Sequence, residues 1–492
     1  MGVLNDLEPK AVFRYFEEIC RIPHGSGNTK AISDYLKEFA ITHDLKYRQD
    51  EWNNVIIWKD ASPGYENAST VMIQGHMDMV CEQEDDCDKN MKTEGLDLFI
   101  EGDLIGAKGT TLGGDDGIAL AMALAVLDDD SICHGPLECV FTVDEEVGLK
   151  GALALDASDL KSDCMINIDS EKDKVLTVSC AGSIRPFFRF PLQRETFAGK
   201  AFTVSVEGLQ GGHSGEEIHL GRANANSLLG RVFYEISQVT ELRVVDIHGG
   251  SKDNAIPRSA QARIVVDDPE KAFEAVDIIR RAVEQEFYST DPDIQLIVSE
   301  AVEAEEPAFD RSLTERIICF LFCAPNGVQV MSADVPGLVQ TSLNIGRIYL
   351  DGNDVVCSAM LRSSVNSQNR EVLAKLQALC KVLGAEVTVA SSYSAWEYKP
   401  VSPLRDVMTE AFRTVYGEEP KVEALHAGLE CGILSGKMPD LDCVSIGPDL
   451  TEIHTPRERL HIQSTGRIWR LLLETLKLLT ARKGGSYDEK EL

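Results

Sequence analysis

The chain of 492 residues is too long for one ordinary hydrophobic core, so we expect two or three domains. Apolar residues make up 43% of the sequence and charged residues 26%, a composition typical of a globular protein in water. The 80 acidic residues outnumber the 48 lysines and arginines, and the resulting net charge of −32 argues against nucleic acid or an anionic membrane as a partner.

The start of the chain and its cysteines predict a cytoplasmic protein. Residues 1–6 lead directly into a charged helix and do not resemble a secretory signal. The longest apolar run, Gly117–Leu127, is too short to cross a bilayer. The 13 cysteines are scattered and include no C-x-x-C pair, which is typical of reduced thiols in the cytosol.

Residues 1–184 alternate between helical and strand-like patterns. Strands that alternate with helices predict an α/β domain with a mostly parallel central sheet. The first stretch is predicted to be helical, because Val12, Phe13, Phe16 and Ile19 recur at helical spacing, and so are Thr29–Phe39 and the alanine-rich Asp116–Leu127. The predicted strands are Asn54–Trp58, Thr70–Gln74, Leu137–Thr142 and Cys164–Ile168.

The order of elements changes at about residue 185. The β-α-β-β-α-β order that follows resembles a ferredoxin-like unit, and a similar order recurs over residues 312–390, which suggests an internal duplication. The first set comprises strand Lys200–Gly208, helix Asn224–Ile236, strands Leu242–His248 and Ala260–Val266, helix Pro269–Phe287 and strand Ile294–Val298.

After residue 397 the α/β pattern returns, with helices over Pro403–Tyr416 and Gln463–Leu479. We therefore predict one catalytic domain made of two segments, residues 1–184 and 397–492. An α+β lid domain of ferredoxin-like halves would be inserted between them, over residues 185–396.

An H-x-D motif follows the predicted strand Thr70–Gln74. Because side chains alternate along an extended chain, His76 and Asp78 point to the same side. An imidazole there can bind a metal ion, and a carboxylate two residues later can orient that imidazole. The motif alone does not distinguish this arrangement from a histidine with a purely structural role.

Acidic residues occupy two further boundaries between elements. Asp115 lies in a G-G-D-D-G segment whose glycines allow a ligand to approach, and its carboxylate could bridge two cations or simply cap the following helix. Glu145 and Glu146 follow the strand Leu137–Thr142, where cations would relieve the repulsion among three adjacent acids. A solvated acidic turn is the alternative interpretation.

Two weaker signals complete the set. Asp169 closes another predicted strand, and His454 lies in a late loop where a lone histidine is usually structural. The carboxyl ends of parallel strands meet at one edge of a sheet, so we expect these groups to lie together. Histidine and carboxylate side chains in this combination suit two zinc ions that share one carboxylate.

The motifs H-x-D, G-G-D-D-G, D-E-E-x-G, N-x-D and E-x-H-T-P, in this order, resemble the zinc exopeptidases that include aminoacylases, carboxypeptidases and dipeptidases. Within that family the likeness is to dipeptidases that act on aminoacyl-histidine substrates. It extends to Gly211–Gly215, Asp253–Pro257 and His426–Gly432 and covers almost the whole chain. The resemblance implies a cytoplasmic hydrolase of dipeptides with two divalent ions, zinc in the first place and manganese or cobalt as alternatives.

The resemblance also implies a role for each site residue. Glu145 would act as general base toward a water held between the ions, and Asp78 would orient His76. Arg362 is also consistent with a surface residue at a strand end. By resemblance, His76 and Asp169 would bind one ion, Glu146 and His454 the other, and Asp115 both, while His213 would stabilise the oxyanion and Asn254 and Arg362 would hold the substrate carboxylate.

Two alternatives remain at this stage. An N-acyl amino acid deacylase would use the same chemistry with a different pocket, and a metal-binding scaffold would have no need of Glu145 or Asp78. Oligomeric state is open as well, because relatives of this kind pair into homodimers. A duplicated lid could instead imitate such a pair within one chain, and His213 would then act on the active site of its own chain.

Overall fold

The computed structural model describes residues 2–481, which form two compact units. Within that range, unit 1 comprises residues 2–179, 398–424 and 429–481, and unit 2 comprises residues 180–397 and 425–428. Each unit has its own hydrophobic core, as expected for a chain of this length. Nowhere in residues 2–481 does a helix combine the length and the apolar character that a membrane span requires.

The centre of unit 1 is an eight-stranded sheet in the order β1-β2-β6-β3-β7-β22-β8-β21. The four middle strands from β6 to β22 are parallel, while β2 and β8 run antiparallel to their inner neighbours. Every residue of β3 and β6 is buried, as expected of strands covered on both faces. The strands are β1 (Lys46–Gln49), β2 (Val55–Lys59), β3 (Val71–His76), β6 (Leu137–Thr142), β7 (Cys164–Asn167), β8 (Val175–Cys180), β21 (Lys421–Leu425) and β22 (Asp442–Ser445).

Helix α3 is the most buried helix of unit 1, since none of its residues from Gly114 to Leu127 is exposed. It packs between α1 and β3, which explains why its sequence is apolar on all sides. The helices of unit 1 are α1 (Lys10–Cys20), α2 (Lys30–Thr42), α3 (Gly114–Asp128), α4 (Lys150–Ala154), α9 (Pro403–Tyr416), α10 (Glu430–Lys437) and α11 (Ile462–Thr480).

A small sheet in the order β23-β24-β5-β4 joins an early and a late segment of unit 1. Its strands are so short that no periodicity marks them in the sequence. The turn between β23 and β24 carries His454, and the pairing of β24 with β5 fixes that turn to the segment preceding α3. The strands are β4 (Leu98–Glu101), β5 (Leu104–Ala107), β23 (Leu450–Thr451) and β24 (Arg459–His461).

Unit 2 contains a ten-stranded sheet whose main order is β15-β10-β14-β12-β18-β19-β9-β20. The first four strands with α5 and α6 form one ferredoxin-like half, and the last four with α7 and α8 form the other in reversed order. The halves meet where β12 pairs with β18. The strands are β9 (Gly182–Pro191), β10 (Arg194–Glu207), β12 (Leu242–Gly249), β14 (Ala260–Val266), β15 (Gln295–Val298), β18 (Val339–Asp351), β19 (Asp354–Ser363) and β20 (Glu386–Tyr393).

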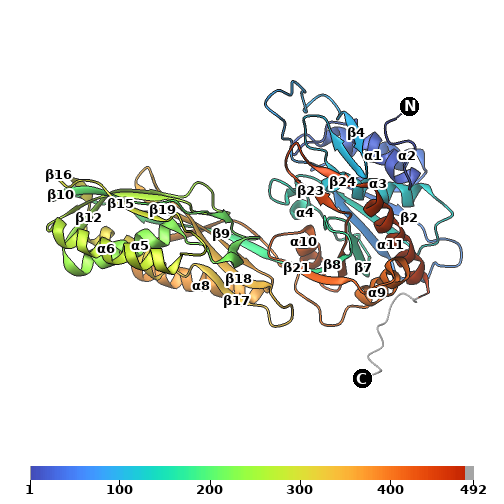
Figure 1. The fold of residues 1–492 in the computed structure, drawn as a ribbon. Helices are drawn as coiled ribbons and strands as arrows, with labels where there is room; N and C mark the ends of the chain where they lie inside the picture. Colours follow the sequence, from blue (N-terminus) through green and yellow to red (C-terminus); the bar gives the residue numbers. More distant parts are fainter. Residues whose placement is uncertain (1, 482–492) are drawn as a thin grey trace. The chain divides into compact units, whose positions relative to one another are not determined.

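The four helices of unit 2 pack on one face of this sheet (Figure 1). An α/β unit that carries an inserted α+β unit of ferredoxin-like halves confirms the predicted fold class. The helices are α5 (Ala225–Val239), α6 (Pro269–Glu286), α7 (Arg311–Cys323) and α8 (Asn366–Leu383), and the smaller elements are β11 (Gly212–His213), η1 (Ile218–Leu220), β13 (Ala255–Ile256), β16 (Val302–Phe309) and β17 (Gly327–Met331).

The two halves are not consecutive in the chain. Strand β9, the first strand of the second half, precedes all the strands of the first half. The sequence pattern did not reveal this strand, and the predicted repeat accordingly began with a helix at residue 312. The first half is therefore inserted between β9 and α7 of the second half.

Candidate dinuclear metal centre

The five predicted metal ligands come together in unit 1, at the carboxyl end of its parallel strands. His76 is the last residue of β3 and not the second residue after it, so the strand itself fixes its backbone. The other four follow strands or begin a helix: Asp115 in the first turn of α3, Glu146 after β6, Asp169 after β7 and His454 between β23 and β24.

The two oxygens of Asp115 face two different histidines. Oδ1 lies 3.1 Å from Nε2 of His76, and Oδ2 lies 3.3 Å from Nε2 of His454. Nε2 of His76 is also 3.9 Å from an oxygen of Asp169, and Nε2 of His454 is 3.0 Å from an oxygen of Glu146. A carboxylate that presents one oxygen to each of two groups of ligands has the geometry of a bridging ligand.

Asp78 connects His76 to the segment that carries Glu145. Nδ1 of His76 lies 3.0 Å from the carbonyl oxygen of Asp78, to which its N–H donates, and this hydrogen bond leaves Nε2 to face Asp115. The carboxylate of Asp78 accepts hydrogen bonds from the backbone N–H of Glu145, at 3.0 Å, and from the hydroxyl of Ser26, at 2.7 Å. The imidazole of His76 is thus oriented by the backbone carbonyl of Asp78, and the nearest oxygen of the Asp78 carboxylate lies 3.6 Å from Nδ1.

The electrostatics of the cluster fit bound cations. Burial raises the pKa of Glu145 well above its usual range, and the nearby acids Glu430 and Glu146 add to the effect. Burial and the charge of Asp116 likewise raise the pKa of Asp169. The site therefore holds more negative charge than its own side chains neutralise, and divalent cations would relieve the excess.

The surrounding carboxylates also shift the pKa of each of the two histidines. Burial alone would lower the pKa of His76, but hydrogen bonds with Asp115 and Asp78 raise it well above the usual value. Hydrogen bonds with Asp115 and Glu146 raise the pKa of His454 to about 11. Burial opposes ionisation of Asp115, but hydrogen bonds from both histidines hold its pKa far below the ordinary range.

Sequence reasoning missed four acids around these ligands. Asp116 accepts the backbone N–H of His76 at 3.1 Å, and Glu171 offers an oxygen within 4.8 Å of those of Asp115 and Asp169. The carboxylate of Glu430 is fully buried beside the side chains of Gln74 and Thr142 on strands β3 and β6, and Glu458 accepts hydrogen bonds from the turn that carries Asp115. Asp116 had a local signal in its place in the G-G-D-D-G segment, and Glu430 lies in the segment His426–Gly432 that the resemblance covers.

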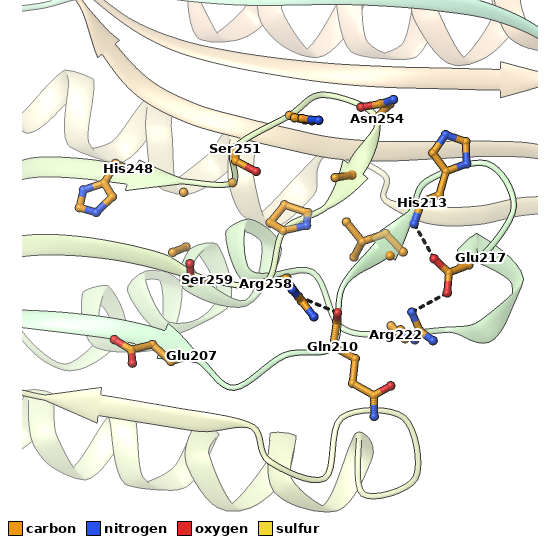
Figure 2. A pocket seen from close by; sticks show the side chains of 18 of the residues that line it. Glu207, Gln210, His213, Glu217, Arg222, His248, Ser251, Asn254, Arg258 and Ser259 are labelled. Atoms are coloured by element: carbon orange, nitrogen blue, oxygen red, sulfur yellow. Dashed lines mark hydrogen bonds and ion pairs between the residues drawn. The ribbon is translucent and has the colours of Figure 1, made fainter. Parts of the chain in front are cut away.

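Unit 2 holds the three predicted substrate-binding residues in one region. One pocket of unit 2 has a volume of about 880 Å³. His213 and Asn254 lie at one end of it, and His248 and Glu207 lie at the other (Figure 2). Strand β11, which ends at His213, pairs with β13, which begins directly after Asn254. The backbone N–H of His213 donates to Glu217 at 2.7 Å, which fixes this end of the pocket.

Arg362 lies in β19 and is buried, with 6% of its surface exposed, so it is not the surface residue that the sequence left open. Its Nε has no hydrogen-bond partner within residues 2–481. A Cβ atom on Gly215 would lie 3.2 Å from this Nε and 3.1 Å from Cε1 of His213, so both side chains border the same small space. A buried guanidinium with unused donors is suited to bind a carboxylate.

His426 lies in the same region and received no role from the sequence. Its Nε2 is 2.7 Å from the hydroxyl of Ser342, the residue opposite Arg362 in the pairing of β18 with β19. Burial lowers the pKa of His426 to about 3, and the charge of Arg362 acts in the same direction. His426 is therefore neutral at physiological pH and does not compete with Arg362 for an anion.

Comparison with known proteins identifies the family. The model of "Peptidase family M20/M25/M40" matches residues 72–478, which is most of the chain. The chain belongs to peptidase family M20/M25/M40. The resemblance inferred from the five motifs and the predicted hydrolase class are thereby confirmed.

Relatives in this family extend over the full length of the chain. It is 35% identical over 491 residues to the cytosol non-specific dipeptidase of Escherichia coli K12, which covers 98% of this chain and all of that protein. The crystal structure of aminoacylhistidine dipeptidase from Vibrio alginolyticus is similar with a TM-score of 0.89 at 35% identity, covering 96% of this chain and 97% of that one. A tripeptidase from Staphylococcus aureus, at 18% identity and a TM-score of 0.57, shares the fold.

Proposed function

We propose that this M20-family peptidase is a cytoplasmic, dinuclear-metal dipeptidase with broad specificity that includes Xaa-His dipeptides. The observation that carries the proposal is the position of Asp115, whose two oxygens face His76 and His454 at 3.1 and 3.3 Å. The full-length likeness to two proteins named as dipeptidases supports the substrate class, and the name of one of them supports the cytosol.

Zinc is the metal that suits these ligands best, because the set combines imidazole and carboxylate groups. His76 and Asp169 would hold one ion, Glu146 and His454 the other, and Asp115 both. The bound cations would supply Lewis acidity, which lowers the pKa of water and polarises a substrate carbonyl.

Glu145 is the general base in this proposal. Its carboxylate accepts the proton of the attacking water and passes it to the nitrogen of the leaving amino acid. Asp78 positions the backbone of Glu145 through the hydrogen bond at 3.0 Å and keeps His76 in one tautomer. Asp78 therefore controls the base through its carboxylate and a metal ligand through its backbone carbonyl oxygen.

Arg362 binds the carboxylate of the dipeptide, and Asn254 and His213 complete the substrate-binding group in unit 2. The proposal is supported by the burial of the guanidinium and by its unpartnered Nε. Replacing Arg362 by methionine should raise KM by about 10- to 100-fold, because a hydrogen bond between charged groups contributes roughly 1.5–3 kcal/mol.

Steady-state kinetics with a dipeptide and with its C-terminal amide would test this role. With the amide, which has no carboxylate to bind, the KM of Arg362→Met should be close to that of the wild type. Arg347→Met is the matched control, because Arg347 lies in the neighbouring strand β18 and stacks on Tyr349. An equal loss with the acid and the amide would contradict carboxylate binding.

The function itself is tested by amino-acid release from a panel of dipeptides and N-acetyl amino acids. We expect dipeptides to be hydrolysed, the activity to disappear after treatment with a chelator, and zinc to restore it, with manganese and cobalt as comparisons. Preferential cleavage of N-acetyl amino acids would instead favour a deacylase. Full activity in protein shown by elemental analysis to contain no metal would contradict the whole proposal.

A further inference from the structure

The carboxylate of Glu458 is bound by the turn that carries Asp115. Glu458 lies four residues after His454 and is buried, with 2% of its surface exposed. Its two oxygens accept hydrogen bonds from four consecutive backbone N–H groups: Leu112 at 2.7 Å, Gly113 at 3.1 Å, Gly114 at 2.8 Å and Asp115 at 3.3 Å.

The shape of this turn depends on the carboxylate. The dihedral angles of Asp115 and Asp116 are not helical, so no regular helix satisfies the four N–H groups, and the buried carboxylate satisfies them instead. Gly113 has φ of +66°, which a residue with a side chain rarely adopts. A Cβ atom on Gly114 would lie 3.2 Å from an oxygen of Glu458, so the backbone approaches the carboxylate closely.

The same residue also fixes the loop of His454. The backbone N–H of Glu458 donates to the carbonyl oxygen of Thr455 at 3.0 Å, which closes a short turn directly after His454. Glu458 therefore connects two segments that are more than 300 residues apart in the chain, and each of them carries a proposed ligand. No other described carboxylate accepts hydrogen bonds from this run of four N–H groups.

We propose that Glu458 is a positioning residue that sets the affinity of both metal sites. The inference rests on the proposed function in one respect, namely the assignment of Asp115 and His454 as ligands. Since Asp115 faces both histidines, a displacement of its turn moves an oxygen away from each site at once. Among the described residues, Glu458 belongs to none of the groups of side chains that could hold an ion.

The variant Glu458→Gln tests the inference without turnover. Glutamine keeps the size of the side chain but replaces one acceptor oxygen by an NH₂ group, so about half of the N–H groups lose their partner. Titration of the metal-free protein with zinc against a chromophoric chelator should show an affinity about 10- to 100-fold lower than in the wild type, as is usual when a group that supports a metal ligand is removed.

Glu138→Gln is the matched control. Glu138 lies in β6, is 3% exposed, and accepts the backbone N–H groups of Lys161 and Ser162 at 3.0 Å, but none of the turns with proposed ligands depends on it. This variant should unfold at a lower temperature and bind zinc with the affinity of the wild type. Glu458→Asp keeps the charge, and its zinc affinity should lie between those of Glu458→Gln and the wild type. This variant takes the place of Glu458→Gln in the test if the glutamine variant does not fold.

At saturating zinc, kcat and KM of Glu458→Gln should return to within a few-fold of the wild type, as expected for a residue that acts only through the ligands. Wild-type zinc affinity in folded Glu458 variants, or an equal loss in Glu138→Gln, would overturn the inference. The proposed function can fail separately. A wild-type protein that binds two ions and hydrolyses no dipeptide would refute that function and leave the role of Glu458 intact.

Discussion

Replacing Glu145 by glutamine should lower kcat for a dipeptide by about 10²- to 10⁴-fold, the usual contribution of a general base. The metal content should not change, because Glu145 is assigned as a base and not as a ligand. Its backbone N–H would still donate to Asp78, so the local fold should persist as well. Steady-state kinetics together with elemental analysis of the same preparation would check both expectations.

The neighbouring acids of Glu145 serve as controls within the same turn. Asp144→Asn should leave kcat nearly unchanged, since the carboxylate of Asp144 accepts the backbone N–H of Gly27 at 2.6 Å and has no assigned part in the chemistry. Glu146→Gln should lower the zinc content, because Glu146 faces His454 at 3.0 Å. If Glu145→Gln kept the wild-type rate, or lost zinc as Glu146→Gln should, the assignment of Glu145 as base would be wrong.

The parts of the fold predicted from the sequence are those with a strong local pattern. Alternating strands and helices predicted the α/β unit, and Gly114–Asp128 is helical because its alanine-rich stretch favours a buried helix. The end of β3 is an element boundary that the local sequence pattern did not predict. The predicted strand ended at Gln74, because glycine and histidine are not typical of a buried strand, yet the sheet pairing continues to His76.

The parts that the sequence did not predict depend on contacts between distant segments. Strand β9 belongs to the second half of unit 2 because it pairs with β19 and β20, and the alternating burial along it does not indicate which strands it pairs with. Ser26 and Glu458 are similar cases, since each supports a ligand through a partner far away in the chain. Motif spacing identifies the groups that do chemistry, but the groups that hold them in place have no fixed spacing.

The largest effect on metal binding is expected from Asp115→Asn. An amide has a single oxygen and no charge, so it cannot present one acceptor to His76 and another to His454 as the carboxylate does at 3.1 and 3.3 Å. Zinc content should fall from two ions to fewer than one, and dipeptide hydrolysis should fall below detection. His454→Ala is the contrasting variant, because it removes a ligand of only one site.

Thermal unfolding gives a second measurement of the loss of zinc binding in Asp115→Asn. A ligand that binds only the folded state stabilises it by about 2.7 kcal/mol when its concentration is 100 times Kd. Added zinc should therefore raise the Tm of the wild type, raise that of His454→Ala by less, and leave that of Asp115→Asn unchanged. An Asp115→Asn protein that kept two ions and the full zinc-dependent rise in Tm would show that no carboxylate is shared. The two histidines would then belong to sites that do not need a bridge, and the role assigned to Asp115 would be wrong.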